Sequence, residues 1–154
     1  MRVLLAAAIA ALTIAAPLPA QPAAPDLSAA TPIPGRWSWT PTAAGSEATF
    51  LDSAGRAQLW LTCLRGARVV TVARPASGAA PLLMAWTSSQ TRNLLASYNP
   101  ATGRITAQIG ATDPLLDALA FSRGRIGLGV SGTPPLVAPA WPEIARVVED
   151  CRGA

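Results

Sequence analysis

Hydrophobic and polar residues alternate along much of the chain between residues 35 and 132, with the period of two that is typical of β-strands. The alternation is clearest in AQLWLTC (57–63), where Cys63 shares a face with Leu59 and Leu61, and Trp60 lies on the other face. Similar patterns predict strands in GRWSWT, SEATFL, ARVVTVAR, LLMAWTSS, RNLLASYN, RITAQIG and RIGLGVSG. Turn signals at RGA and SSQT join neighbouring segments into two antiparallel hairpins.

The hydrophobic period changes to that of a helix in two segments. In residues 113–123, Asp113 is a helix cap, Pro114 suits the first helical position, and Gly124 is placed to end the helix. In residues 142–151, Pro142 begins a helix whose apolar face is made of Ile144, Val147, Val148 and Cys151. The segment TPPLVAP between them (133–139) is expected to be a rigid connector.

These patterns predict one α+β domain that is mainly an antiparallel β-sheet or sandwich, with both helices packed on it. Cys63 and Cys151 both lie on core-facing sides of their elements, which indicates a disulfide where the last helix meets the sheet. On the strand 125–132, Gly127 and Gly129 share a face, so a large side chain is expected to pack closely over them.

The first 34 residues have a different composition. Residues 1–20 combine Arg2, an uncharged apolar stretch and a tail of small residues, the pattern of a secretory signal peptide. Residues 21–34 are rich in proline and alanine and are expected to be a linker or a disordered arm. Residues 35–154 then form the single globular domain, periplasmic or secreted, with no membrane span after signal cleavage.

Charge excludes several functions. The chain has 12 basic residues, 8 acidic residues and no histidine, and every basic residue is arginine. Lysine Schiff bases, P-loop lysines and histidine-dependent catalysis are therefore excluded. Removal of residues 1–20 takes away Arg2, which leaves 11 arginines against 8 acids and a net charge of +3. The arginines are scattered, so nucleic-acid binding is not expected, and no cofactor or metal site is predicted.

The carboxylates allow two interpretations. Asp113 and Asp117 lie four residues apart on a predicted helix, and Glu143, Glu149 and Asp150 belong to the last helix. They could serve a carboxylate-only hydrolase acting on cell-envelope glycans. First-turn acids more commonly stabilise the helix, and Glu149 and Asp150 lie off the apolar face, so no catalytic residue is predicted.

A binding surface is the preferred hypothesis. Trp60 is out of phase with its apolar neighbours, so it is either exposed or part of a two-sided core. The loops TSSQTR and SRGR place Arg92, Arg123 and Arg125 where an anionic partner could contact them. These residues favour a non-enzymatic exported domain that binds a protein or an envelope component. An inhibitor of a hydrolase is a special case of this function.

The segments WTSSQTR, DPLLDALAFSRGRI and PAWPEIARVVEDCR together resemble a family of uncharacterised exported bacterial proteins, over Gly35 to Arg152. In layout the chain is also similar to invasion-associated locus B proteins and to some type VI secretion accessory proteins. The shared features are an export signal, a β-rich body, a mid-chain cysteine after an apolar strand and a last helix that ends in cysteine. The resemblance implies a periplasmic or secreted interaction domain, and it transfers no functional residue. The single cysteine pair and the absence of lysine depart from that layout.

Overall fold

The alternating segments form strands in the computed structural model, whose described part is residues 25–153. The predicted signal peptide and residues 21–24 of the predicted linker lie outside this part. Over the described residues the strands are β1 (Gly35–Thr42), β2 (Gly45–Asp52), β3 (Ala57–Leu64), β4 (Val69–Pro75), β5 (Leu82–Trp86), β6 (Thr91–Asn99), β7 (Arg104–Gly110), β8 (Ile126–Val130) and β9 (Leu136–Ala138). The helices are the 3₁₀ turn η1 (Arg65–Ala67), α1 (Pro114–Ala120) and α2 (Pro142–Arg152).

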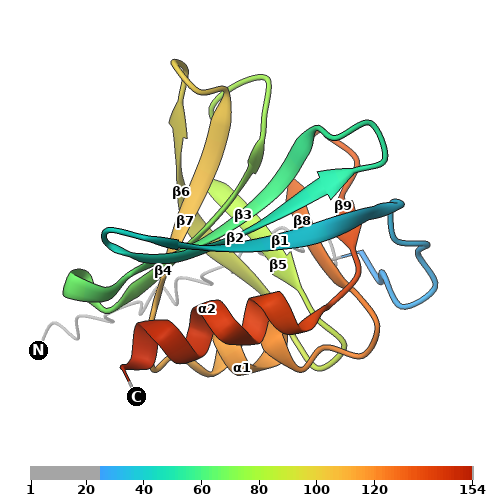
Figure 1. Cartoon of the computed structure of the whole chain (residues 1–154). Helices are drawn as coiled ribbons and strands as arrows, with labels where there is room; N and C mark the ends of the chain where they lie inside the picture. Colours follow the sequence, from blue (N-terminus) through green and yellow to red (C-terminus); the bar gives the residue numbers. More distant parts are fainter. Residues whose placement is uncertain (1–24, 154) are drawn as a thin grey trace, which may run out of the picture.

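All nine strands of the described chain belong to one antiparallel sheet, in the order β1-β2-β3-β4-β7-β6-β5-β8-β9. The predicted hairpins β3–β4 and β5–β6 are both present. The α+β prediction is confirmed: the strands curl into a half-barrel, with both helices on one side of it (Figure 1).

The core lies between the concave side of the sheet and the two helices. Helix α2 contacts β1 to β4 and also packs on α1. Its apolar face is buried as predicted, by Ile144, Val147, Val148 and Cys151. Among residues 25–153, no helix has the length and apolar character needed to cross a membrane.

A disulfide joins the sheet to the last helix, as predicted. Cys63 of β3 and Cys151 of α2 are both buried and bonded, with 5.3 Å between their Cα atoms. Because Cys63 faces the core with Leu59 and Leu61, the bond lies inside the main hydrophobic cluster.

The first and last strands of the sheet are tied together. The indole Nε1 of Trp37 in β1 donates a hydrogen bond to the carbonyl of Pro139, just after β9, at 2.7 Å. The backbone N–H of Ile33 donates to the carbonyl of Val137 in β9 at 2.9 Å. These two bonds, here called the seam, bring the two ends of the nine-stranded sheet together, although β1 and β9 do not pair with each other as strands.

One local prediction was wrong, and one predicted helix is present but shorter than expected. The segment expected to be a rigid connector contains β9, whose Val137 and Ala138 are buried. It pairs with β8 although prolines flank it, because a three-residue edge strand needs few ladder bonds. Helix α1 ends at Ala120, earlier than residue 123, and Gly124 adopts its positive φ in the turn that follows.

The predicted linker is not a free arm over its described part. Residues 25–34, here called the arm, contain no helix or strand, but Leu27 is only 5% exposed. Leu27 packs with Met84, Trp86 and Val137 in a second small cluster. Since Met84 and Trp86 alternate with the core residues Leu83 and Ala85, this cluster lies on the outer face of the sheet.

The predicted close packing over the glycine face is confirmed. Cδ1 of Leu27 lies 2.3 Å from the position that a Cβ atom would take at Gly127, so only glycine leaves room for the leucine. At Gly129 the neighbouring atom is Cε of Met84, at 2.8 Å. Leu27 of the arm therefore packs into a closely fitting space, here called the seat of Leu27, on the outer face of β5, β8 and β9.

Candidate binding surface

Trp60 does not provide an exposed aromatic surface, which corrects one part of the predicted site. Its side chain points to the outer face of β3, as its phase indicates, but Trp60 is only 8% exposed. The guanidinium of Arg104, two strands away on β7, stacks over the indole ring at 3.5 Å from its centroid. A cation over an aromatic face is a stabilising contact, so Trp60 and Arg104 cover each other.

Arg92 is also engaged within the molecule. Its two terminal nitrogens donate to the two carboxylate oxygens of Asp113 at 2.7 and 3.0 Å. Asp113 additionally accepts the N–H of Leu115 and so caps α1, as predicted. The bonds from Arg92 lower the pKa of the Asp113 carboxyl, partial burial opposes that shift, and the Leu115 N–H adds to it. An anionic partner would have to displace Asp113 to bind Arg92.

This pair predicts a pH-dependent contribution to stability. Because the folded-state pKa of Asp113 is depressed, the pair stabilises the fold above the unfolded pKa of about 3.9, and the contribution is lost as the pH falls through the folded-state pKa. We expect Asp113→Asn to lower the free energy of unfolding by about 1 kcal/mol at pH 7, a value discounted for the solvent around Arg92. Urea denaturation at pH 7 and pH 2 measures the difference, which should be smaller at pH 2. An equal difference at both pH values would contradict this account.

Two further predicted carboxylates, Asp117 and Asp150, are bonded to arginines, whereas Glu143 and Glu149 form no salt bridge among the described residues. Asp117 accepts a hydrogen bond from Arg152 at 2.7 Å, and this bond lowers the pKa of Asp117. Ser46 and Arg65 lower the pKa of Asp150. A general acid needs a raised pKa to hold its proton near neutral pH, so these shifts have the wrong direction for that role. Within residues 25–153, no group of three or more metal-ligating side chains is gathered.

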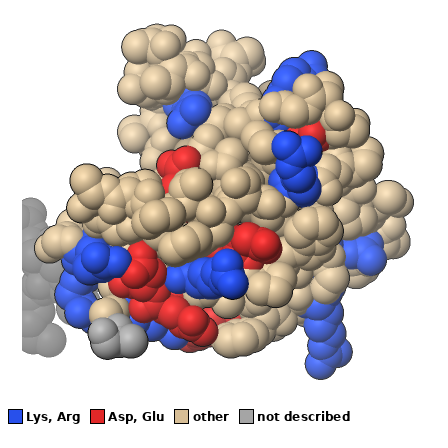
Figure 2. Space-filling view, viewed as in Figure 1, with Lys and Arg blue, Asp and Glu red and all other residues tan. Residues whose placement is uncertain are grey.

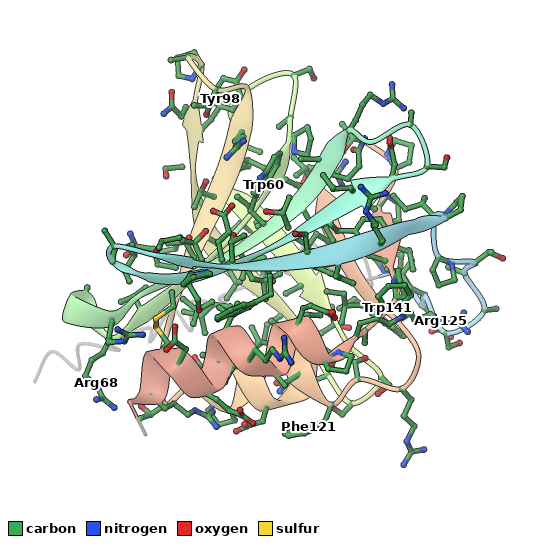
Figure 3. The ribbon with its side chains drawn as sticks, in the orientation of Figure 1. Trp60, Arg68, Tyr98, Phe121, Arg125 and Trp141 are labelled. Carbon is green, nitrogen blue, oxygen red and sulfur yellow. A yellow bond between two sulfur atoms is a disulfide. The ribbon has the colours of Figure 1, made fainter. Side chains whose placement is uncertain are left out.

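Three connections come together at one end of the molecule, near the end of α1 and the start of α2 (Figures 1 and 3). They are the β5–β6 turn (residues 87–90), the α1–β8 loop (121–125) and the β9–α2 connection (139–141), here called the loop end. The N–H of Ser88 donates to Oγ of Ser122, the N–H of Arg123 donates to Oγ of Ser88, and Oγ of Ser122 donates to the carbonyl of Arg125. The N–H of Ala140 donates to the carbonyl of Gly124 at 3.4 Å. These bonds hold the loops to one another.

The loop end exposes two large aromatic side chains that the sequence analysis did not select. Phe121 is 74% exposed and Trp141 is 40% exposed. Arg123 lies on the loop that begins with Phe121, is exposed, and makes no salt bridge among the described residues. Arg125, on the same loop, is half-buried and donates to the carbonyl of Ala30 in the arm. Of the four residues predicted for binding, the structure therefore groups Arg123 and Arg125, while Trp60 and Arg92 are occupied elsewhere.

A signal for Phe121 was present in the chain. The buried face of α1 is made of Leu115, Leu116 and Leu119. Residue 121 falls on the opposite side of that helical repeat, so the period places its phenyl ring toward solvent. Trp141 gives a weaker signal, since it only precedes Pro142, which holds it in an extended conformation at the start of α2.

Other surface features are less suited to binding. A shallow depression of about 540 Å³ beside α2 is lined by Trp39, Arg65, Arg146, Glu149, Asp150 and Gly153. Arg65 is paired with Asp150 there, and Arg146 lies over the ring of Trp39. Figure 2 shows arginines and acids side by side on this face, so their charges largely compensate one another. Leu95, 85% exposed on β6, has no arginine among its strand partners.

The chain has no match among the known proteins with which it was compared. No protein-family model, no curated protein and no solved structure matches the chain.

Proposed function

We propose that the protein is an exported, non-enzymatic domain that binds an acidic surface of a protein partner through its loop end. The observation that carries this proposal is the exposure of Phe121, Trp141 and Arg123 on adjacent loops. Aromatic residues and arginine contribute most of the binding energy in many protein interfaces. Exposed aromatic groups beside an unpaired arginine are therefore a suitable binding surface.

The rigidity of the loops supports this proposal. Binding a flexible loop costs conformational entropy, and a surface that is already ordered avoids part of that cost. The bonds between Ser88, Ser122 and the α1–β8 loop fix Phe121 and Arg123 relative to the barrel. Stable loops on a disulfide-closed sheet are a common arrangement for binding modules.

The charge of the loop end indicates the charge expected of the partner surface. From residue 118 to residue 142 the chain contains no aspartate or glutamate, and its charged residues there are Arg123 and Arg125. An acidic partner surface complements this segment and is also attracted by the positive charge of the mature chain. An acidic face of a secreted hydrolase would fit the same chemistry, so inhibition of such an enzyme is one form of this function.

Export is part of the proposal. It is supported by the signal-peptide pattern of residues 1–20 and by the buried disulfide, a bond that forms in oxidising compartments. The alternative of a carboxylate-only hydrolase has less support, because Asp113 and Asp117 are both bonded to arginines.

The test is affinity capture from envelope extract with quantitative mass spectrometry. We expect Phe121→Ala, Trp141→Ala and Arg123→Ala each to lower the affinity for the captured partner at least tenfold, since each removes a group of the contact surface. Leu95→Ala and Arg68→Ala are the matched controls, because both residues are exposed outside the loop end, and they should leave affinity unchanged. Capture that is insensitive to all three loop-end variants, or turnover on a substrate panel without any partner, would contradict the proposal.

A further inference from the structure

The seat of Leu27 adjoins the loop end. Arg125 lies on the same loop as Phe121 and Arg123, and its guanidinium extends to the carbonyl of Ala30 in the arm. Three residues earlier in the arm, Leu27 fills the space over Gly127 between Met84, Trp86 and Val137. The arm thus occupies a site, here called the arm site, with two features: an apolar space that fits one leucine, and a cation at one end.

The cation of the arm site, Arg125, is only partly satisfied by its present partner. Among residues 25–153 Arg125 forms no salt bridge, and its partner is a neutral backbone carbonyl. Hydrogen bonds from arginine to a carboxylate are shorter and about twice as strong as bonds between neutral groups. A chain that offered a carboxylate at this position would therefore bind Arg125 better than the arm does.

The part of the arm before Ile33 is held by few contacts. Leu27 is its one buried side chain, with Ala30 packed beside it, and Arg125 supplies its hydrogen bond to the body. Ile33 is held separately, because its side chain packs against the main core and its N–H donates to Val137. The other bonds of the arm are internal, between Leu27 and Ala30 and between Asp26 and Ser28. Segments with few buried contacts open with little free energy, so a better ligand can replace residues 25–31 while Ile33 keeps its contacts.

We infer that the arm site is a docking site for an extended acidic segment of the partner protein, which displaces residues 25–31 of the arm. The segment carries a side chain of leucine size for the space over Gly127 and a carboxylate about four residues later for Arg125. The spacing follows from the arm, because Thr31 is the exposed residue next to the carbonyl that Arg125 binds. The inference rests on the proposed function. It adds the local sequence that the partner must carry, and it identifies the arm of this chain as an intramolecular competitor of that sequence.

The test uses the full mature chain with Leu27→Ser, which empties the leucine space, and a labelled peptide of residues 25–34. One peptide carries Thr31→Glu and the control peptide carries Thr31→Gln, which is neutral and of similar size. Fluorescence anisotropy should show at least tenfold tighter binding of the glutamate peptide. This preference should disappear when Arg125→Gln is added and persist when Arg123→Gln is added. The wild-type chain should bind the glutamate peptide at least tenfold more weakly than the Leu27→Ser chain, because its own arm competes.

Gly127→Ala is a second variant, which tests the leucine space without changing Leu27 itself. Its added methyl group takes the leucine space, so peptide binding should be lost, whereas Gly110→Ala, at a strand position of β7 where the added methyl group meets nothing within 4 Å, should retain it. Equal binding of the two peptides overturns the inference, as does no binding to a Leu27→Ser chain that circular dichroism shows to be folded. Neither result affects the proposed function, whose test reads Phe121, Trp141 and Arg123.

Discussion

Replacing both Cys63 and Cys151 by alanine should lower the free energy of unfolding by about 4 to 5 kcal/mol. The disulfide closes a loop of 88 residues, and on the chain-entropy model a loop of this length restricts the unfolded chain by about that amount. For a domain of this size the loss corresponds to a fall in Tm of roughly 15 to 25 °C. The effect is large because the bond joins elements that are far apart in the chain, β3 and α2.

Urea denaturation and calorimetry of the oxidised wild type and of the double variant measure this loss. The reduced wild type is the matched control, since it breaks the same bond while keeping both sulfur atoms. The reduced wild type and the double variant should agree to within about 1 kcal/mol, because an alanine replaces each thiol in the core at a small cost in packing. A double variant as stable as the oxidised protein would show that the disulfide does not restrict the unfolded chain as proposed.

Truncation of Trp37 should give the second largest effect. Trp37 is 6% exposed, packs against Phe50 with 5.3 Å between ring centroids, and donates to the Pro139 carbonyl across the seam. We expect Trp37→Ala to lower the free energy of unfolding by about 3 to 5 kcal/mol, because it leaves a cavity and an unpaired carbonyl. Equilibrium unfolding in urea measures this loss.

Trp37→Phe separates the two parts of that loss. The phenyl ring keeps much of the contact with Phe50 but cannot donate to Pro139, so we expect a loss of about 1 to 2 kcal/mol. If the phenylalanine variant were as stable as the wild type, the bond across the seam would contribute nothing. If it were as unstable as the alanine variant, the packing of the ring would contribute nothing.

The regular elements were predictable because their residues alternate with a clear period. Trp37, Cys63 and Ile144 all face the core as their spacing indicates. The short strand β9 was not predictable, since three residues between prolines carry too little pattern to distinguish a strand from a connector. Residues 136–138 form a strand because they pair with β8, and this pairing is seen only in the folded structure.

The candidate site was only partly predictable, for a related reason. Periodicity shows which face a side chain is on, but it does not show which distant residue covers that face. Trp60 points outward as its phase indicates, yet Arg104 covers it, and Arg92 is bound by Asp113 from another element. In the arm, composition alone could not reveal that Leu27 has a seat over Gly127, because that seat is built by three separate strands.

The seam also affects the order in which the structure is completed. Trp37 and Pro139 are 102 residues apart in the chain, and a ribosome or a translocation channel releases the chain from its N-terminus. Until Pro139 has emerged, the indole N–H of Trp37 lacks the carbonyl that it binds in the folded protein, and the two ends of the sheet are not yet connected. Contacts between residues so far apart in sequence also form slowly. The connection between the two ends of the sheet is therefore made only after almost the whole chain has emerged.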